Sequence, residues 1–381
     1  MPVPKFSISA NGVDITGRIA GSGVTMTITD GVGSKSDTLS IVISDVDGSV
    51  AAPKTGAILN PVGGYEGRMR DFGQFSVDSV VFSGWPQQIT IQAKSVAAKS
   101  LAKQRDPKAY PKKDFATYGD IFSDVAGRIG LTLTISNDIK ATVNVYEAQT
   151  EENSLEFLTR IGDKLNASIT VKSGRLVVVS RGDSLSASGT GLPDVLVARG
   201  SNLLKYSVTE KDEPRHSTVE ASYYDRKKNK KETVEEKTGL DGPRFTIRTP
   251  HQDKDEAQRA AKAQAKKLNR DTGDATFEIN GEPFAQAEAN AVVSGCRSNV
   301  DGIWSIRSVT HNFSASGAYT TSLSCTKPND NSGSGPGSGS GKSSSSSASS
   351  STKTNPAGAV PRSGLEAGAP SLTGDPGSNI G

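Results

Sequence analysis

Two stretches of the sequence repeat each other and decide how the fold is interpreted: GQFSVDSV at residues 73–80 and GIWSIRSV at residues 302–309. They align without gaps, with four of the eight positions identical and the aromatic and aliphatic positions matched in kind. A glycine-containing turn and another alternating stretch follow each of them. Two amphipathic strands can agree this well by chance. The other interpretation is that the first and last β-rich parts of the chain are two copies of one barrel.

The residues around both stretches predict short strands. Apolar side chains alternate with polar ones, which is the period-two pattern of a half-buried strand. An Asn11–Gly12 pair between apolar residues indicates a hairpin turn. Because turn residues recur at short, regular intervals, residues 1–94 are expected to form a barrel or a sandwich. On the repeat interpretation, residues 1–94 and 201–327 are two barrel domains. The alternating stretches are residues 24–28, 39–43 and 88–93 in the first domain and residues 277–279, 303–313 and 319–325 in the second.

Three other stretches carry apolar residues at helical spacing. Thr117 is the expected N-cap of the first helix, and Ser154 or Asn153 that of the second. Both helices lie in residues 95–200, which are predicted to form a small α+β insert domain. The third helix, residues 253–271, belongs to the second barrel domain. Its first turn is acidic and its last turn is basic, as the helix dipole favours.

The composition changes after Lys327. Residues 331–352 contain 12 serines and almost no side chain able to form a core. Such a segment cannot bury enough apolar surface to offset the entropy that ordering would cost. Residues 328–381 are therefore predicted to be a disordered tail or tether. The fold class expected for the whole chain is mainly β, with two barrels flanking an α+β insert.

Charge and composition exclude several classes of protein. With 44 basic and 41 acidic residues the net charge is +3, which is too small for a general nucleic-acid coat. No apolar run approaches the length of a membrane span, and the N-terminus lacks an apolar signal core, so we expect synthesis in a cytoplasm. The two cysteines, Cys296 and Cys325, cannot build a disulfide framework, and no CxxC is present.

No pattern of residues indicates an enzyme. The three histidines, His216, His251 and His311, lie outside any metal-ligand spacing, and there is no Gly-x-Ser-x-Gly elbow. His311 is expected to be an ordinary surface or hydrogen-bonded histidine of a strand. Acidic pairs and the Asp45–Gly48 turn are interpreted as solvated surface and a plain β-turn. We predict no catalytic residue, no metal site and no cofactor.

One basic run stands out as a contact candidate. It contains Arg226, Lys227, Lys228, Lys230 and Lys231 between two strand-like segments. The simplest interpretation is a solvated hairpin tip. The functional alternative is a contact with DNA or with an acidic partner surface.

Four strings, which lie in order along the chain within residues 37–57, 73–91, 152–176 and 301–320, resemble segments of a known family. The family is the late control D proteins of contractile-tailed bacteriophages, which are baseplate hub proteins related to the N-terminal part of VgrG spike proteins. The most specific string, ENSLEFLTR at residues 152–160, looks like the family's ESDLxFLxRL segment, with Asn153–Ser154 in place of Ser-Asp. The resemblance covers roughly residues 1–327 and leaves out the Ser-rich tail. The strings are Asp37–Ile41 with Asp45–Gly48 and Pro53–Ala57; Gly73–Asp78 with Gly84–Pro86 and Ile89–Ile91; Glu152–Arg160 with Asn166–Ala167 and Gly174–Leu176; and Asp301–Ile306 with His311 and Gly317–Thr320.

The resemblance implies a homotrimeric ring to which each subunit contributes two tube-like barrels. Six barrels would present pseudo-sixfold symmetry to the tail tube protein and threefold symmetry to a trimeric spike. Because no spike-like segment follows residue 327, the spike is expected to be a separate protein. The ring would bind other baseplate proteins and the tape measure, and would form the channel through which DNA leaves. It would be assembled in the host cytoplasm and carried in the virion.

Three rival interpretations stay open at this stage. The same hub could belong to a DNA-free, tailocin-like injection particle. The chain could instead be a tail-associated cell-wall hydrolase, although it has no ordered acid or metal motif. It could also be a carbohydrate-binding tail module, although it has only two tryptophans.

Overall fold

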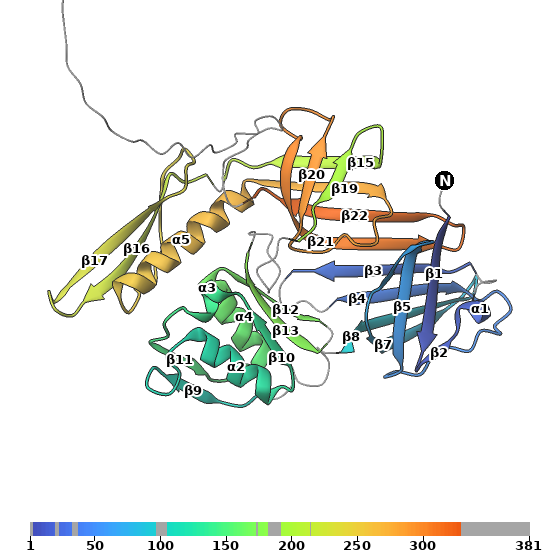
Figure 1. Cartoon of the computed structure of the whole chain (residues 1–381), viewed down its shortest axis with the longest axis horizontal. Helices are drawn as coiled ribbons and strands as arrows, with labels where there is room; N and C mark the ends of the chain where they lie inside the picture. The colour runs from blue at the N-terminus through green and yellow to red at the C-terminus, as the bar shows by residue number, and fades with distance from the viewer. Residues whose placement is uncertain are drawn as a thin grey trace, which may run out of the picture. The chain divides into compact units, whose positions relative to one another are not determined.

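The computed structural model describes residues 3–19, 23–32, 37–96, 105–172, 174–181, 192–213 and 215–328. Strands dominate the described residues, and only a few helices accompany them (Figure 1). The prediction of a mainly β fold is confirmed. The predicted tail lies outside the described residues, apart from Pro328.

The N-terminal residues form what we call the first β unit. Its hydrogen-bonded strand order is β3-β4-β8-β7-β5-β1. The Asn11–Gly12 pair makes the expected two-residue turn between β1 and β2, with positive φ at both residues. The elements are β1 (Pro4–Ala10), β2 (Val13–Asp14), α1 (Thr16–Ile19), β3 (Thr25–Gly31), β4 (Thr38–Ser44), β5 (Ile58–Tyr65), β6 (Arg68–Asp71), β7 (Phe75–Ser83) and β8 (Gln88–Ser95).

A second β unit near the C-terminus repeats this arrangement. Six strands follow one another along the chain and pair in the order β15-β19-β22-β21-β20-β14, which matches the first unit strand for strand. Only the last pair differs, because β14 runs parallel to β20 whereas β1 runs antiparallel to β5. The strands are β14 (Val195–Ala198), β15 (Leu203–Glu210), β19 (Gly273–Asn280), β20 (Asn290–Ser294), β21 (Gly302–Ser314) and β22 (Tyr319–Thr326).

The repeated sequence stretches occupy equivalent strands, β7 and β21, and bend at the same position. The pairing of β7 with β8 shifts register between Val77 and Ser79. The pairing of β21 with β22 shifts between Ile306 and Ser308, which are the aligned residues of the second stretch. A bulge inserts one extra residue and increases the local twist of the strand. A chance likeness of two amphipathic strands does not account for a shared bulge within a shared strand order.

The two units are not separate closed barrels, which corrects the sequence-based expectation. Within the described residues, one 14-stranded sheet runs through both and ends at β15 and β2. The units are joined where β3 pairs antiparallel with residues Ser308–Ser314 of β21. Figure 1 shows these strands, blue and orange, side by side. The outer strand of the first unit thus satisfies its free backbone groups on the second unit instead of closing on its own unit. We call this pairing the joint.

An α+β segment separates the two units and has its own core. Helices α2 and α4 pack on a three-stranded sheet ordered β10-β13-β12, and β9 pairs with β11. Thr117 caps α2, as the sequence predicts, and Asn153, one of the two predicted candidates, caps α4; each cap is part of a capping box. The elements are β9 (Lys108–Pro111), α2 (Tyr118–Arg128), β10 (Thr132–Ile135), α3 (Asn137–Lys140), β11 (Tyr146–Gln149), α4 (Ser154–Leu165), β12 (Ala167–Lys172) and β13 (Arg175–Ser180).

A further subdomain is inserted between β15 and β19 of the second unit. The predicted long helix forms with Asp253 as its N-cap. Its small buried residues, Ala257, Ala261 and Ala265, let it lie close against β16, where Val219 and Ala221 complete a separate small core. The elements are β16 (Thr218–Asp225), β17 (Lys230–Lys237), β18 (Arg244–Thr246) and α5 (Lys254–Asp271).

Candidate functional site

The basic run occupies the tip of the β16–β17 hairpin, which we call the basic hairpin. The turn is fixed by the Asp225 carboxylate, which accepts hydrogen bonds from the backbone N–H of Lys227 at 2.9 Å and of Lys228 at 3.3 Å. Asn229 adopts the positive φ that the tight turn requires. The sequence interpretation of a solvated hairpin tip therefore fits the backbone, and contact with a partner stays a prediction.

Part of the charge of the basic hairpin is neutralised within it. Glu232 lies 2.9 Å from Lys228 Nζ and 3.7 Å from Lys230 Nζ. Among the described residues, Arg226, Lys227 and Lys231 make no ion pair. Exposed pairs of this kind contribute little to stability, so the fold does not depend on the run. Its positive charge is available to a partner.

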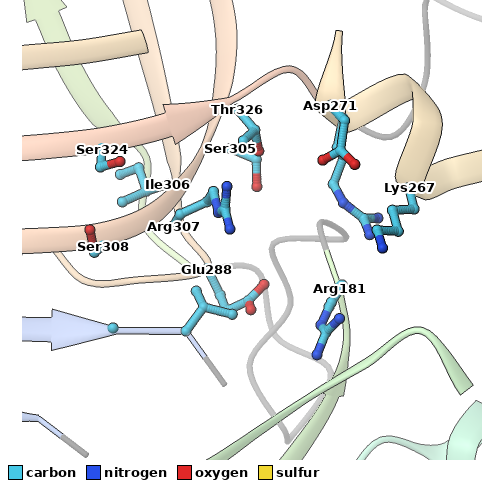
Figure 2. A pocket seen from close by; sticks show the side chains of 13 residues that line it. Arg181, Lys267, Asp271, Glu288, Ser305, Ile306, Arg307, Ser308, Ser324 and Thr326 are labelled. Carbon is cyan, nitrogen blue, oxygen red and sulfur yellow. The ribbon is translucent and has the colours of Figure 1, made fainter. Parts of the chain in front are cut away.

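A second basic feature, which the sequence did not indicate, is a cleft of about 450 Å³ that we call the basic cleft. Figure 2 shows side chains from three parts of the chain pointing into it: Arg307 from β21, Lys267 and Asp271 from α5, and Arg181 after β13. Arg270 and Glu288 also line the cleft, so its charged lining consists of four cationic and two acidic side chains. The cleft therefore carries net positive charge.

The cations of the basic cleft act on one another. Burial and the neighbouring Arg181 and Arg307 guanidinium groups lower the pKa of Arg270. Arg270 donates a 3.0 Å hydrogen bond to Asn166 at the end of α4, and Arg181 pairs with Asp163 of α4 at 2.8 Å. Arg307 is the bulged residue of the second repeat. The hydrogen bond from Arg270 thus ties α5 to the α+β segment at the cleft, while Arg307 adds positive charge from β21.

A buried ion-pair network fixes α4 against α5 on the same side of the α+β segment. Lys164 pairs with Glu147 at 2.8 Å and also with Glu256 of α5. Glu147, which is 5% exposed, also accepts from the Tyr118 hydroxyl at 2.9 Å and pairs with Arg160 at 3.2 Å. Burial opposes the charge of Lys164, but its hydrogen bonds to Glu147 and Glu256 prevail and raise its pKa. Lys164 therefore stays protonated and links two helices that are distant in sequence.

Replacing Lys164 with Met should lower the free energy of unfolding by about 2 kcal/mol. The value lies between those for exposed and fully buried pairs, because the side chain is only partly exposed and the change removes the cation that Glu147 and Glu256 share, while each carboxylate keeps other partners. Urea unfolding at pH 7 measures the loss. Lys262→Met, at an exposed position of α5, is the matched control. Equal losses in the two variants would contradict a stabilising role for the network.

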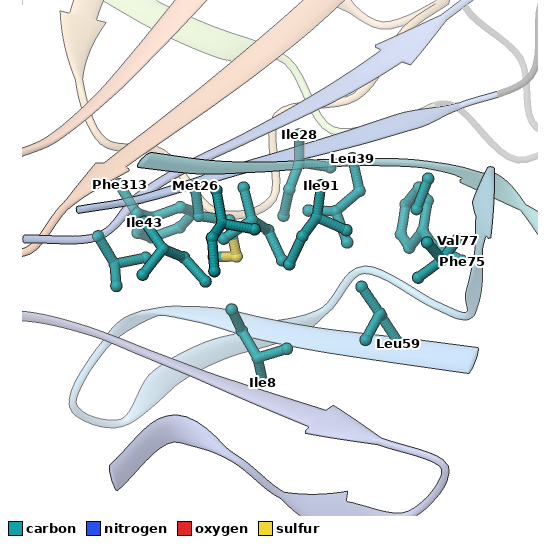
Figure 3. Close-up of a cluster of buried hydrophobic side chains, with 14 of the residues drawn as sticks. Ile8, Met26, Ile28, Leu39, Ile43, Leu59, Phe75, Val77, Ile91 and Phe313 are labelled. Atoms are coloured by element: carbon teal, nitrogen blue, oxygen red, sulfur yellow. The ribbon is translucent and has the colours of Figure 1, made fainter. Parts of the chain in front are cut away.

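At the joint, aromatic side chains of the second unit pack into the apolar core of the first unit. Figure 3 shows Phe313 of β21 among Ile8, Met26 and other buried residues of the first unit. Its ring stacks on Tyr319 with centroids 4.0 Å apart and meets Phe72 edge-on at 6.1 Å. Apolar burial of this kind is the main stabilising contribution to a joint between units.

Two strand edges carry exposed apolar side chains. The first is residues Ser79–Ser83 of β7, which we call the outer edge; Val81 and Phe82 are 51% and 69% exposed. The second is β15, where Leu204 and Tyr206 are exposed. Sequence reasoning missed both. The sequence did contain a signal for the outer edge in the consecutive apolar residues 80–82, because consecutive apolar residues in a strand place apolar side chains on both faces of the sheet.

The histidines His216 and His311 and the Asp45 carboxylate, which the sequence singled out, occupy structural positions in the described part of the chain. His311 is fully buried, with Nδ1 2.9 Å from the Tyr319 hydroxyl, so it is a hydrogen-bonded core residue. His216 packs on Phe245, and the Asp45 carboxylate accepts from Val50 N–H in a plain turn. Over the described part of the chain, no group of three or more His, Cys, Asp or Glu side chains is arranged to hold a metal ion. No described helix is long and apolar enough to cross a membrane.

Known proteins are similar to this chain in sequence and in fold. No protein-family model matches the sequence. The baseplate hub proteins of Escherichia phages 186 and P2 are each 28% identical to it over 363 residues, covering 84% of this chain and 92% of each relative.

Solved structures share the fold at lower identity. The 43 kDa tail protein of prophage MuSo2 from Shewanella oneidensis matches with a TM-score of 0.63 at 14% identity, over 86% of this chain and 99% of that protein. The Escherichia coli c3393 protein, a type VI secretion component similar in structure to the bacteriophage T4 tail proteins gp27 and gp5, matches with a TM-score of 0.53 at 9% identity, over 87% and 79% of the two chains. The resemblance stated from the sequence is thereby confirmed: this chain is similar to the baseplate hub proteins of P2- and 186-like phages in sequence and to phage tail proteins in fold.

Proposed function

We propose that this protein is the central hub of a contractile phage baseplate and acts as a homotrimeric ring. Each subunit would contribute two tube-like β domains, so the ring would present six similar units to the sixfold tail tube and three subunits to the spike. Its role is mechanical and not enzymatic. It closes the end of the tube, holds the spike, and forms the channel through which DNA leaves.

The observation that carries this proposal is the internal repeat. Two units with one strand order and one bulge position are what a threefold protein needs to match a sixfold partner. The division into residues 1–94, 95–200, 201–327 and 328–381 belongs to the same proposal. Separate apolar cores in the two β units and the α+β segment support the first three parts.

The partners follow from this role. They are the tail tube protein, a separate trimeric spike, other baseplate proteins and the tape measure. Assembly would take place in the host cytoplasm, and the protein would remain in the tail of the virion. DNA would pass through without sequence-specific binding, as the near balance of charge in the chain suggests.

A DNA-free contractile injection particle is the second candidate, and the fold shared with a type VI secretion component favours it. The neighbouring genes distinguish the two candidates. Capsid and terminase genes beside this one indicate a phage, and a tail cluster without them indicates an injection particle.

The solution mass of the full chain tests the proposal. Light scattering should give three times the monomer mass of 39.7 kDa, alone or when the chain is co-expressed with the tail genes adjacent to its own. Negative-stain images of the same peak should show a ring with a central hole. A monomer in both preparations would overturn the ring.

Reversing the charge of the basic hairpin tests its role as a partner contact. Replacing Arg226, Lys227 and Lys231 with Glu should leave the melting temperature and the trimer mass unchanged, because these side chains make no ion pair among the described residues. We expect at least tenfold fewer complete baseplates when the variant replaces the native protein. Lys112→Glu with Lys113→Glu, in an exposed turn of the α+β segment, is the control. Assembly at the native level would show that the basic hairpin is only solvated surface.

A further inference from the structure

The two β units of one chain are joined by pairing between an edge strand of each. Each unit also has a second strand edge that has no partner strand among the described residues. At the joint, β3 of the first unit pairs with the second half of β21, from Ser308 opposite Gly31 to Ser314 opposite Thr25. In the repeat, β15 corresponds to β3, and β7 corresponds to β21. The counterparts of the joined strands are therefore β15 and the outer edge of β7.

Both counterparts lack a partner strand on one side within the described residues. β15 ends the 14-stranded sheet and pairs only with β19. β7 pairs with β8 along its length, but with β5 only at Phe75 and Ser76, so the outer edge from Ser79 onward has no neighbour. Unpaired strand edges with exposed apolar side chains are templates for pairing with another chain.

Exposed side chains on the free edges correspond, through the repeat, to side chains that are buried at the joint. At the joint, Val309, His311 and Phe313 of β21 are buried. Their counterparts by the aligned repeat begin with Val80 and Phe82, and Phe82 is 69% exposed in the single chain. Trp85, just beyond the outer edge, is 84% exposed. Exposed apolar side chains at an unpaired strand edge favour an interaction with another chain.

We propose that the outer edge of one subunit pairs antiparallel with β15 of a second copy, reproducing between subunits the joint seen within the chain. This inference rests on the proposed homotrimer, which gives the number of subunits in the ring. The internal repeat identifies the residues that pair. Each copy offers one edge of each kind, so the contact is head to tail, and such contacts close into rings when the rotation permits.

The repeat also fixes the register of this seam. Starting from the shared bulge, Ser83 corresponds to Asn312. Across the equivalent pairs β7–β8, β8–β4 and β4–β3, Ser207 corresponds to Thr27. Asn312 lies opposite Thr27 at the joint, and their side chains are hydrogen-bonded at 3.1 Å. Ser83 should therefore lie opposite Ser207 of the neighbouring subunit.

The register makes two further pairs testable. Phe82 should face Val208, as His311 faces Ile28 at the joint. Val81 should face Thr209, as Thr310 faces Thr29. Directly opposite residues of antiparallel strands have Cα atoms about 4.5–5.5 Å apart, which is within the range that a disulfide can bridge.

Cysteine cross-linking of the full-length chain tests the seam. Val81→Cys with Thr209→Cys is made in a Cys296→Ser background, in which the native Cys325 stays buried. Diamide oxidation should convert more than half of the chains into covalent species of up to three subunits on a non-reducing denaturing gel. The control, Val81→Cys with Lys205→Cys, is about 13 Å out of register and should stay monomeric on the gel. Each single-cysteine variant should do the same.

A complementary variant tests the apolar strip. Phe82→Lys should reduce the trimer fraction at least tenfold without changing the melting temperature of the subunit, because the side chain is mostly exposed there. Tyr146→Lys, at a 50% exposed aromatic of the α+β segment, is the control and should leave the trimer intact.

The outcomes separate the seam from the ring. A trimer by light scattering that fails to cross-link in the predicted register, or that cross-links equally in the control, overturns the seam and leaves the hub proposal standing. A chain that stays monomeric alone and with its adjacent tail genes overturns the hub proposal and the seam with it. Selective cross-linking at the predicted pair supports both.

Discussion

Phe313→Ala should lower the free energy of unfolding of the first β unit by about 3–5 kcal/mol, although residue 313 belongs to the second unit. The ring is 1% exposed and packs among first-unit side chains and Tyr319. It also fills the space above Gly63, where a Cβ atom would lie only 2.5 Å from the ring. Removal leaves a cavity at the joint that neither unit can close by itself.

Urea unfolding combined with hydrogen-exchange mass spectrometry would measure this effect unit by unit. Exchange should accelerate in β1, β3 and β5 of the first unit. Phe277→Ala is the matched control, since Phe277 is equally buried but packs within the second unit. A loss below 1 kcal/mol, or faster exchange confined to the second unit, would show that Phe313 does not stabilise the joint.

Acidification should weaken the same joint through His311. The side chain is fully buried, and burial, helped by the nearby Arg70, lowers its pKa from 6.5 to about 3. Asp30 acts in the opposite direction but does not prevail. Nδ1 lies near the Tyr319 and Thr321 hydroxyl groups. The folded protein therefore holds His311 neutral where an unfolded chain would protonate it.

The sign of the pH effect follows from proton binding. Between pH 6.5 and pH 3 the unfolded state binds a proton at residue 311 that the folded state does not, so stability falls as the pH falls through this window. From pH 7.5 to pH 4.5 the contribution of His311 to this loss should be about 3 kcal/mol. Above about pH 8 both states are neutral at this residue and the dependence disappears.

Comparison with His311→Gln isolates this contribution, because other groups titrate equally in both proteins. Urea unfolding at pH 7.5 and pH 4.5 should show that the native protein loses about 3 kcal/mol more than the variant over this interval. If both proteins lose the same amount, His311 is either solvated or protonated in the folded state.

The sequence predicted the elements whose signals are local. Thr117 and the pair Asn153–Ser154 were recognised as cap residues and placed the starts of α2 and α4, and the acidic first turn placed the start of α5, because such signals act within one turn of their own helix. Alternation of apolar residues located most strands of both units. The repeat of residues 73–80 at 302–309 predicted two related units, and one chain is enough to detect it.

β5 shows where local signals failed. Its sequence, ILNPVGGY, contains Asn, Pro and two glycines, which are poor strand formers, and no strand was predicted there. It is a strand because Gly63 leaves room for the Phe313 ring and Gly64 fits against the carbonyl oxygen of Arg68. Arg68 is close in sequence, but Phe313, which makes Gly63 necessary, belongs to β21, so a window along the sequence around β5 does not contain the main reason.

The sequence by itself therefore determined the helices, most strands, the existence of a repeat and the resemblance to phage baseplate hub proteins. The tertiary structure alone decided that β3 joins β21, whose residues Thr27 and Asn312 are hydrogen-bonded although they are 285 positions apart. It also decided that, among the residues the structure describes, the outer edge of β7 and one edge of β15 have no partner strand. Strand edges pair through backbone N–H and C=O groups, which are the same in every residue. Which two edges pair therefore depends on how the side chains of the strands pack in the core, and residues distant in sequence come together there only when the chain folds.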